Sequence, residues 1–541
     1  MTIEATSAER RASASPSLTP LPTLSDAVAT HARLQPGRVA LRDSRRCLSY
    51  AQWDARSSLL AAALLGLGLQ PGDRVALLAY NRIEWWELYA ALARAGLVAV
   101  PVNFRLAAPE IAYIVEHSQA RALVVQDGLL DRVEPIQSTL GIPLERWVHL
   151  SDDDGPRSLS SRPGLDYEAL IQAQANQGTP GPAIDVRPDD LFALMYTSGT
   201  TGRPKGAMRN HAGNALIAMA TALEFGLSRE DNGLLVMPLC HANSLYFGMT
   251  FAMLGATIVV DDRAHFDPKA LLRQLAHDRI TFTSLVPTHY IMMLDLPSEV
   301  KAGLDLSAVG KLLISSAPAR RETKLGIMSL FPNSRLFELY GSTEAGWVTV
   351  LRPDEQLDHL GSVGREWAGS GPIRLLDERG EEVPDGEVGE LHSRTSYVFS
   401  GYWQNPEKTA EAFRGAWCSV GDMARRDEQG FIHLVDRKSN MIISGGENIY
   451  PSEVEALLCT HPGVQDVAVV GLPDAKWGEA VCAVIVARPG HVLDAQTLDD
   501  WIRPRIAGFK RPRHWRLIDE AEMPRTATGK IQHRVLRDRL K

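Results

Sequence analysis

The chain has 541 residues, of which 45% are hydrophobic and 23% charged, a composition typical of a soluble globular protein. This length exceeds what a single hydrophobic core usually serves, so two or more domains are expected. The net charge of −8 argues against a nucleic-acid-binding protein, because such proteins are more often basic. The five cysteines have no metal-ligand spacing and are odd in number, which favours a reduced, cytoplasmic location.

Residues 1–22 are rich in Ser, Ala, Pro and Thr and contain no apolar core of the signal-peptide type, so we expect a disordered tail. The longest apolar stretch, 90–102, contains Arg94 and Pro101 and is too short to span a bilayer. No membrane span is therefore expected.

Residues 23–436 alternate apolar runs typical of strands with amphipathic runs typical of helices. An early example predicts a strand at 73–78, a helix at 85–95 and another strand at 96–102. Such alternation is typical of α/β layers. We expect an α/β protein whose large N-terminal domain consists of layered α/β subdomains.

A smaller, mobile α+β domain is expected at 441–541, after a hinge at 437–440. Ser452 and Glu455 have the spacing of a capping box ahead of a short helix. The last 41 residues contain twelve Lys or Arg against four Asp or Glu. Two interpretations of this excess stay open: a solvated basic face, or a cationic lid that attracts phosphate groups.

The most informative stretch, 196–206, reads Tyr-Thr-Ser-Gly-Thr-Thr-Gly-Arg-Pro-Lys-Gly. It follows a strand-like run at 191–195, and a helix is expected after Asn210. Glycines let backbone N–H groups approach an anion, hydroxyls donate to its oxygens, and the ammonium of Lys205 neutralises charge. The spacing is not that of a P-loop, because Lys205 follows a proline. The residues predicted to hold phosphate are Thr197, Ser198, Gly199, Thr200, Thr201, Gly202 and Lys205.

The same eleven residues resemble the nucleotide-binding signature of the acyl-adenylate-forming (AMP-binding) superfamily, which comprises acyl-CoA synthetases, nonribosomal-peptide adenylation domains and beetle luciferases. Five further segments match this superfamily in order, and the resemblance covers nearly the whole chain. The segments are Pro-Leu-Cys-His at 238–241, Ser-Ser-Ala-Pro at 315–318, Glu-Leu-Tyr-Gly-Ser-Thr-Glu-Ala-Gly at 338–346, Gly-Asp at 421–422 and Pro-Arg-Thr-Ala-Thr-Gly-Lys-Ile at 524–531.

The resemblance implies ATP as a substrate and Mg²⁺ as its counter-ion. It places Tyr340 against adenine, the hydroxyl of Thr343 at the α-phosphate and Glu344 on Mg²⁺, which prefers hard oxygen ligands. Asp422 matches the carboxylate that accepts both ribose hydroxyls, and Arg437 matches an arginine near the same ribose. Other residues implied at the nucleotide are Ser316, Ala317, Pro318, Glu338, Leu339, Gly341 and Ser342, although the usual Gly-Gly-Ala-Pro is Ser-Ser-Ala-Pro here.

Lys530 matches the adenylation lysine of the family. A carboxylate that attacks the α-phosphate brings two anions together, and a fixed ammonium between them stabilises the transition state. The resemblance implies a first step that gives acyl-AMP and pyrophosphate, and a second step in which a thiol attacks the acyl carbonyl and releases AMP. The small domain is expected to rotate between the steps about a hinge at Ser439, where Asp or Lys is more usual.

Two segments favour coenzyme A as the acceptor, because 444–451 and 474–479 look like those of acyl-CoA synthetases. Gly445 and Gly446 allow the pantetheine arm to pass close to the backbone, and Trp477 is expected at the same cofactor. Luciferase activity is not expected, since the lysine of that branch is Ile443 here.

The acyl pocket is expected around His241, Ser244, Tyr246 and Trp347. Because Trp347 is bulky, the preferred substrate is a short, branched or cyclic acid, with or without a hydroxyl group. An aromatic acid of the benzoate or cinnamate type is the second choice, and a medium- or long-chain fatty acid the third. The alternative that Trp347 only packs in the core stays open.

Two other functions also stay open: a non-catalytic ATP-binding homologue, and an enzyme that loads a carrier protein instead of CoA. Retention of Lys205, Glu344, Asp422 and Lys530 argues against the first. The expected partners are a small carboxylic acid, ATP and CoA, and no nucleic acid. A homodimer is expected only by analogy with relatives.

Overall fold

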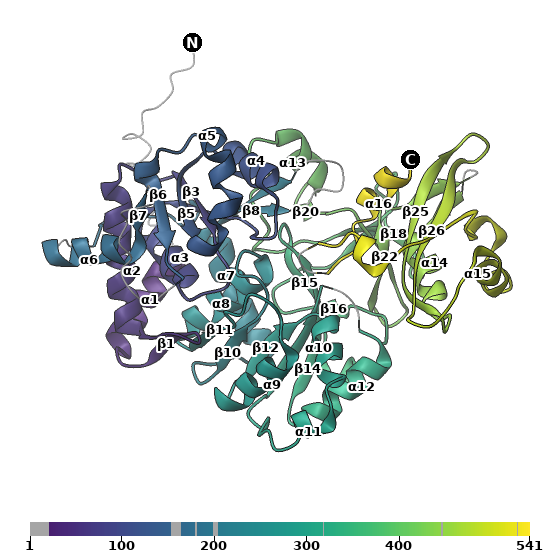
Figure 1. Cartoon of the computed structure of the whole chain (residues 1–541), viewed down its shortest axis with the longest axis horizontal. Coiled ribbons are helices and arrows are strands. Elements are labelled where there is room, and N and C mark those ends of the chain that lie inside the picture. Colours follow the sequence, from purple (N-terminus) through teal and green to yellow (C-terminus); the bar gives the residue numbers. More distant parts are fainter. Residues whose placement is uncertain are drawn as a thin grey trace, which may run out of the picture.

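The computed structural model describes residues 21–152, 164–178, 181–197, 204–316, 319–444, 447–526 and 529–541. Two large sheets with helices on their faces form most of the chain (Figure 1). The first sheet has the order β7-β6-β5-β3-β4-β8-β9 and is parallel except at its last pair. Its strands are β3 (Arg74–Leu78), β4 (Val98–Pro101), β5 (Ala120–Gln126), β6 (Trp147–Leu150), β7 (Leu165–Asp166), β8 (Leu191–Thr197) and β9 (Lys205–Asn210).

The second sheet has the order β16-β15-β14-β13-β12-β10-β11-β1-β2, parallel from β14 to β1 and antiparallel at both ends. The central strands are buried throughout, as parallel strands covered on both faces should be. Its strands are β1 (Val39–Arg42), β2 (Cys47–Ser49), β10 (Asn232–Leu235), β11 (Thr257–Val260), β12 (Phe282–Leu285), β13 (Lys311–Ser315), β14 (Arg335–Ser342), β15 (Gly346–Leu351) and β16 (Arg365–Glu366).

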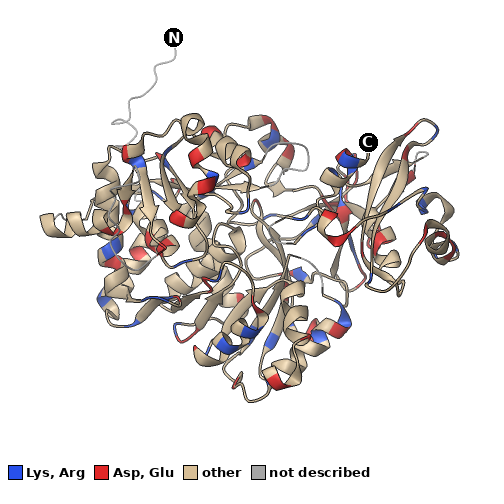
Figure 2. Cartoon of the chain, viewed as in Figure 1, with Lys and Arg blue, Asp and Glu red and all other residues tan. Residues whose placement is uncertain are grey.

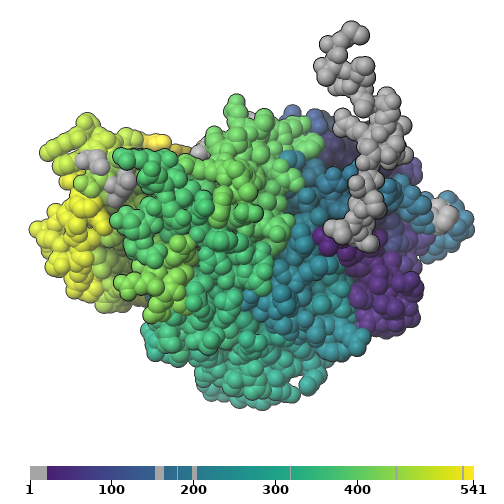
Figure 3. Space-filling model, turned by 180° about the vertical axis from the view of Figure 1, so that it is seen from behind, coloured from purple at the N-terminus to yellow at the C-terminus, as the bar shows by residue number. Residues whose placement is uncertain are grey.

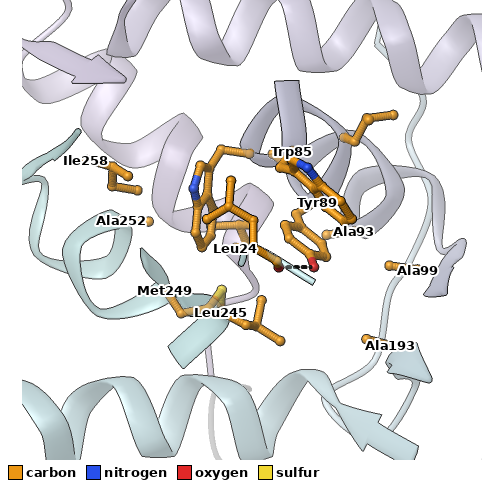
Figure 4. Close-up of a cluster of buried hydrophobic side chains, with 14 of the residues drawn as sticks. Leu24, Trp85, Tyr89, Ala93, Ala99, Ala193, Leu245, Met249, Ala252 and Ile258 are labelled. Carbon is orange, nitrogen blue, oxygen red and sulfur yellow. Dashed lines mark hydrogen bonds between the residues drawn. The ribbon is translucent and has the colours of Figure 1, made fainter. Parts of the chain in front are cut away.

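A helical layer lies between the two sheets and carries the main hydrophobic core. Figure 4 shows Leu24, Trp85, Tyr89 and Leu245 gathered with residues of strands from both sheets. The helices pack closely, because a Cβ on Gly248 would lie 1.8 Å from the ring of Trp86. The helices of this half are α1 (Leu24–Leu34), α2 (Tyr50–Gly66), α3 (Glu84–Ala95), α4 (Ala108–Ser118), α5 (Gln137–Leu140), α6 (Tyr167–Gln177), α7 (His211–Phe225), α8 (Ala242–Leu254), α9 (Pro268–His277), α10 (Pro287–Leu294), α11 (Ser298–Lys301) and α12 (Arg321–Leu330).

Two smaller sheets follow, antiparallel except for the parallel pair of β26 and β27 in the second. The first is a four-stranded sheet of β17 (Arg374–Leu376), β18 (Val388–His392), β21 (Asp422–Arg426) and β22 (Ile432–Arg437), with α13 (Pro406–Ala412), β19 (Phe413–Arg414) and β20 (Trp417–Cys418) beside it in sequence. The second is a five-stranded sheet of β23 (Ile442–Ser444), β24 (Glu447–Ile449), β25 (Val464–Asp474), β26 (Gly478–Ala487) and β27 (His514–Leu517), with α14 (Pro451–Leu458), α15 (Ala495–Ile502) and α16 (His533–Leu540).

The C-terminal sheet occupies one end of the molecule, at the right in Figure 1. Seen from behind in Figure 3, the C-terminal residues (yellow) lie at the end opposite the N-terminal helices (purple). The α/β layers expected from the sequence are confirmed, as is the strand–helix–strand unit of β3, α3 and β4. None of the helices in the described part of the chain is long and apolar enough to cross a bilayer.

The predicted capping box at Ser452 is wrong. The helix begins at Pro451, so Ser452 lies inside its first turn, and its amide donates to Asp436 Oδ2 at 2.9 Å. Glu455 instead accepts from the backbone of Val469 at 2.7 Å. Partners from neighbouring strands have therefore replaced the local reciprocal bonds that the spacing predicted.

Candidate active site

Two of the phosphate-binding candidates, Thr197 and Lys205, lie at the end of the β8–β9 hairpin where the connecting loop begins. Thr197 and Lys205 are directly paired across its last rung. The helix after Asn210 begins as expected, with the Asn210 side chain accepting from the Gly213 amide at 2.7 Å. The remaining candidates of this loop, Ser198, Gly199, Thr200, Thr201 and Gly202, lie outside the described residues.

Glu344 lies beside this hairpin. Its Oε1 accepts from the hydroxyl of Thr197 at 3.1 Å and from the hydroxyl of Tyr402 at 2.8 Å. The residue is 6% exposed, and among the described residues no hydrogen-bond donor is placed on its Oε2. Two hydroxyls therefore fix the orientation of this carboxylate through one of its oxygens.

Lys205 completes this group, with its Nζ 4.0 Å from the centre of the Tyr402 ring. Desolvation lowers the pKa of Lys205, and the nearby charge of Glu344 opposes that change. Burial and the charge of Glu344 raise the pKa of Tyr402 far above its ordinary range, so the phenol remains a donor at neutral pH.

A second group joins β14 to the hairpin of β21 and β22. The Tyr340 hydroxyl donates to Asp422 Oδ2 at 2.6 Å, and Arg437 Nε lies 3.0 Å from Asp422 Oδ1. Burial, followed by the charge of Asp422, raises the pKa of Tyr340 well above its ordinary range. The charge of Asp422 is the largest cause of the raised pKa of Arg437. Of the three residues predicted at the adenosine, Tyr340 and Arg437 therefore both contact Asp422.

The remaining residues of the 315–318 and 338–346 segments shape the backbone of the site. Ser316 has φ of +70°, a left-handed conformation in which glycine is normally preferred. Ala317 and Pro318 lie outside the described residues. The carboxylate of Glu338 is buried and lies 2.8 Å from Nζ of Lys324. This ion pair ties α12 to β14.

Leu339 is buried in the main core, whereas Gly341 and Ser342 end strand β14. The Ser342 hydroxyl accepts from the amide of Ala345 at 2.9 Å, which closes the turn that carries Thr343 and Glu344. The carbonyl of Thr343 accepts from the Tyr246 hydroxyl at 3.2 Å. The turn is thereby fixed from both sides.

His241 lies at the start of α8, after the end of β10. Desolvation, aided by the charge of Arg105, lowers the pKa of His241 to about 4, so its imidazole is neutral at pH 7. Its Nε2 is buried and has no hydrogen-bond partner among the described residues. The imidazole of His241 at the start of α8 therefore has one buried ring nitrogen that makes no hydrogen bond to the described residues.

The other acyl-pocket candidates use their polar atoms within the protein. Ser244 donates to the Met237 carbonyl at 2.7 Å, and the Trp347 indole N–H donates to the Thr221 hydroxyl at 3.1 Å. Trp347 is 5% exposed and packs against the rings of Tyr246 and Phe247, with centroids 5.1 and 5.5 Å away. The indole is thus fixed in its position.

Lys530 is an exposed residue whose pKa is affected by Arg437 and Asp422, two of the residues predicted at the adenosine. Desolvation and the charge of Arg437 lower its pKa, while the charges of Asp422 and Asp436 oppose this change. Its carbonyl accepts from the Thr526 amide at 2.7 Å, and the Thr526 hydroxyl accepts from its amide at 3.1 Å. Charges on β21 and β22 therefore act on this lysine from the last part of the chain.

The connector between β22 and β23 contains Ser439, whose Oγ is buried without a hydrogen-bond partner in the described part of the chain. The flanking residues are held more firmly: Lys438 pairs with Glu390 at 2.9 Å, and Asn440 donates to Asp436 at 3.1 Å.

Two cations lie over the ring of Trp477, with Nζ of Lys476 4.9 Å and Cζ of Arg513 4.3 Å from its centre. Gly445 and Gly446 lie outside the described residues.

Acids elsewhere in the domain neutralise part of the basic C-terminal segment, and Figure 2 shows both charge signs interspersed at this end. The pairs include Arg503 with Asp499, Lys510 with Glu453, Arg511 with Asp499 and Arg525 with Asp466.

Sequence reasoning missed Tyr402 and Arg209. Arg209 is 1% exposed, donates to the Tyr397 carbonyl at 2.7 Å and lies over the Tyr246 ring. Neither residue stands in a stretch with a chemical pattern of its own. Only their contacts with distant segments mark them, so a single sequence offered no signal for either.

Comparison with known proteins identifies the family of the chain. A family model for the AMP-binding enzyme matches residues 28–403, and one for the AMP-binding enzyme C-terminal domain matches residues 453–530. The chain belongs to the AMP-binding enzyme family.

Several of the most similar relatives of this AMP-binding enzyme are ligases of coenzyme A. It is 36% identical over 502 residues to a feruloyl-CoA synthase from Amycolatopsis sp, covering 92% of this chain and 95% of the relative. It is 34% identical over 514 residues to an indoleacetate–CoA ligase from Aromatoleum aromaticum, covering 94% and 96%. The structure of an anthranilate CoA ligase in complex with anthranoyl-AMP matches with a TM-score of 0.84 and 27% identity, covering 96% of this chain and 98% of that one. The enzyme is an AMP-forming acyl-CoA synthetase, which joins a carboxylic acid to CoA with ATP.

Proposed function

We propose that the two groups around Glu344 and Asp422 carry out adenylation, with Lys530 between nucleotide and acid. The observation that carries this assignment is the geometry of the two carboxylates, with Asp422 held by Tyr340 and Arg437 and Glu344 held by Thr197 and Tyr402. Lys205 and the β8–β9 loop bind the triphosphate, and Asp422 accepts the ribose hydroxyls. Thr343 donates to the α-phosphate. His241, neutral at pH 7, lies against the reacting carboxylate without adding a charge.

Mg²⁺ fits the chemistry of Glu344. No group of three or more His, Cys, Asp or Glu side chains suited to a metal occurs among the described residues. Mg²⁺ is commonly held by one or two carboxylates together with substrate phosphates and water. The available Oε2 of Glu344 supplies such a ligand, and the bound ion would neutralise phosphate charge.

In the first half-reaction the carboxylate of the acid attacks the α-phosphorus and pyrophosphate leaves. The Lys530 ammonium stabilises the negative charge that develops where the two anions meet. In the second half-reaction the thiol of CoA attacks the acyl carbonyl and AMP leaves. We propose that residues 441–541 rotate about Ser439 between the two, presenting Gly445, Gly446 and Trp477 to CoA.

The acid is proposed to be short, branched or cyclic. Trp347 is held by Thr221 and by two aromatic rings, so it cannot turn aside for a long chain without loss of these contacts. A pocket limited by a fixed ring excludes substrates by volume. An aromatic acid is the second candidate, which the named substrates of the feruloyl- and anthranilate-activating relatives favour.

The proposed setting is the cytoplasm, since all five cysteines are free. A homodimer is proposed by analogy with relatives, and light scattering of the purified enzyme tests it.

The experiment that tests the function is pyrophosphate release with ATP and Mg²⁺ over a panel of acids, with and without CoA. The panel contains acetate, branched hydroxy acids, cyclohexanecarboxylate, benzoates, ferulate and palmitate. CoA-dependent turnover with short, branched or cyclic acids supports the proposal. Release only with palmitate contradicts the proposed substrate. ATP binding without release for any acid supports a non-catalytic homologue instead.

Replacing Trp347 with leucine should widen the acid range. We expect the ratio of kcat/KM for octanoate to that for the best compact acid to rise about 10–100-fold, since a few methylenes in an apolar pocket change discrimination by this order. Trp367→Leu is the control, because Trp367 is a buried tryptophan of the same core cluster. Equal effects of both variants, measured on folded protein, would mean that Trp347 only packs in the core.

A further inference from the structure

Tyr402 lies in a segment that is bound to strand β9. Its backbone forms a bridge with Ala207, and the next amide, of Trp403, donates to the Gly206 carbonyl at 2.8 Å. The Tyr402 amide donates to the Thr409 hydroxyl at 2.9 Å, and the side chain is 5% exposed. The ring therefore has little freedom to move relative to Lys205 at the start of the same strand.

One side chain thus contacts two oppositely charged groups through different parts of its structure. The hydroxyl donates to Glu344 Oε1 at 2.8 Å, and the ring face lies 4.0 Å from Nζ of Lys205. The aromatic face attracts the cation through its quadrupole, while the hydroxyl satisfies the anion. The two contacts hold an ammonium and a carboxylate near each other without joining them.

The absence of a direct pair is informative. A carboxylate and an ammonium near each other in a weakly polar interior attract strongly. Nevertheless no ion pair between Lys205 and Glu344 is formed in the described part of the chain, although the charge of Glu344 acts on the pKa of Lys205. The two hydroxyls on Oε1, from Thr197 and Tyr402, fix the direction of the carboxylate instead.

We propose that Tyr402 is a positioning residue that prevents Lys205 and Glu344 from neutralising each other. It keeps the ammonium available to phosphate and keeps Oε2 of the carboxylate available to Mg²⁺. This inference rests on the proposed roles of Lys205 and Glu344. The site is then preorganised before ATP arrives, because no ion pair has to break when the nucleotide and its metal bind.

The test compares two substitutions of the same residue. Tyr402→Phe retains the ring under Lys205 and removes only the hydroxyl on Glu344. Tyr402→Leu removes both. Calorimetric titration of the full-length enzyme with ATP, in the presence and absence of Mg²⁺, measures nucleotide binding independently of turnover. Pyrophosphate release at increasing Mg²⁺ gives the apparent metal requirement.

For Tyr402→Phe we expect ATP affinity without Mg²⁺ to change by less than about threefold. The gain in affinity on adding Mg²⁺ should fall, and the apparent Mg²⁺ requirement should rise, by about 10–100-fold, as for other residues that orient a metal ligand. For Tyr402→Leu we expect the same metal defect together with weaker ATP binding without Mg²⁺.

Phe399→Leu is the matched control, since Phe399 is a buried ring that packs against Tyr402 with centroids 4.9 Å apart. A wild-type Mg²⁺ response in Tyr402→Phe would overturn the inference, as would an equal defect in Phe399→Leu. If the wild-type enzyme binds ATP with the same affinity with and without Mg²⁺, the proposed role of Glu344 fails instead.

Discussion

Replacing Lys530 with alanine is expected to slow acyl-adenylate formation about 10²–10³-fold, the usual loss when one preorganised charge donor is removed from a transition state. The second half-reaction should be spared, because thioester formation from acyl-AMP no longer brings two anions together. Pyrophosphate release measures the first step. Consumption of a supplied acyl-AMP with CoA measures the second.

Lys541→Ala is the control, since Lys541 is a lysine of the same basic segment that pairs with Asp538 at 3.2 Å. Equal slowing of both half-reactions in Lys530→Ala would contradict the assignment of Lys530 to adenylation. A loss in Lys541→Ala as large as that in Lys530→Ala would indicate that the overall charge of the segment matters, not one ammonium.

The same lysine predicts a pH dependence. Its pKa is lowered, chiefly by desolvation and then by Arg437, and its charged form is the active one. Adenylation should therefore fall as the pH rises through this lowered pKa, at a pH below that expected for an ordinary lysine. Lys530→Arg should retain no such alkaline decline in whatever adenylation remains, because a guanidinium stays charged.

Replacing Asp422 with asparagine should weaken ATP binding about 10²–10⁴-fold, because two ribose hydroxyls would each lose a charged acceptor worth about 1.5–3 kcal/mol. The fold should also lose about 1–3 kcal/mol, since Tyr340 and Arg437 lose their shared partner. The value should be near the lower limit because Arg437 is partly exposed to water. Calorimetric titration with ATP and chemical denaturation measure the two effects.

Asp427→Asn is the matched control. Asp427 directly follows β21, the strand of Asp422, and its carboxylate accepts from His433 at 2.9 Å. An Asp422→Asn enzyme that binds ATP as well as Asp427→Asn would contradict the assignment of Asp422 to ribose. A loss of stability without a loss of affinity would assign Asp422 a structural function.

The local chemistry of the chain was sufficient to predict the strand before the Ser/Thr/Gly loop and the α/β class. A buried strand followed by hydroxyls, glycines and Lys205 is a pattern of adjacent residues, and its physical meaning does not depend on distant partners. The same is true of the helix that begins after Asn210, because an N-cap acts within three residues.

Local reasoning failed where partners from elsewhere competed. Ser452 and Glu455 have the spacing of a capping box, yet the carboxylate of Asp436 and the amide of Val469 bind them instead. Glu338, placed at the nucleotide by resemblance, has a buried partner in Lys324 that the sequence did not indicate, and its place at the nucleotide stays a prediction. A sequence pattern specifies which hydrogen bonds and ion pairs a residue is able to make. Packing decides which partner lies within bonding distance in the folded chain.

The chain's own sequence therefore determined which residue types are available for phosphate, ribose and adenylation chemistry, and in which order they occur. Tertiary structure alone decided their mutual geometry. Thr197 is 147 residues from Glu344, and Tyr402 is 58 residues from it, yet both hydroxyls bind the same oxygen. Such contacts arise when separate elements bury their apolar faces together, and this long-range burial has no signature within any short stretch of residues.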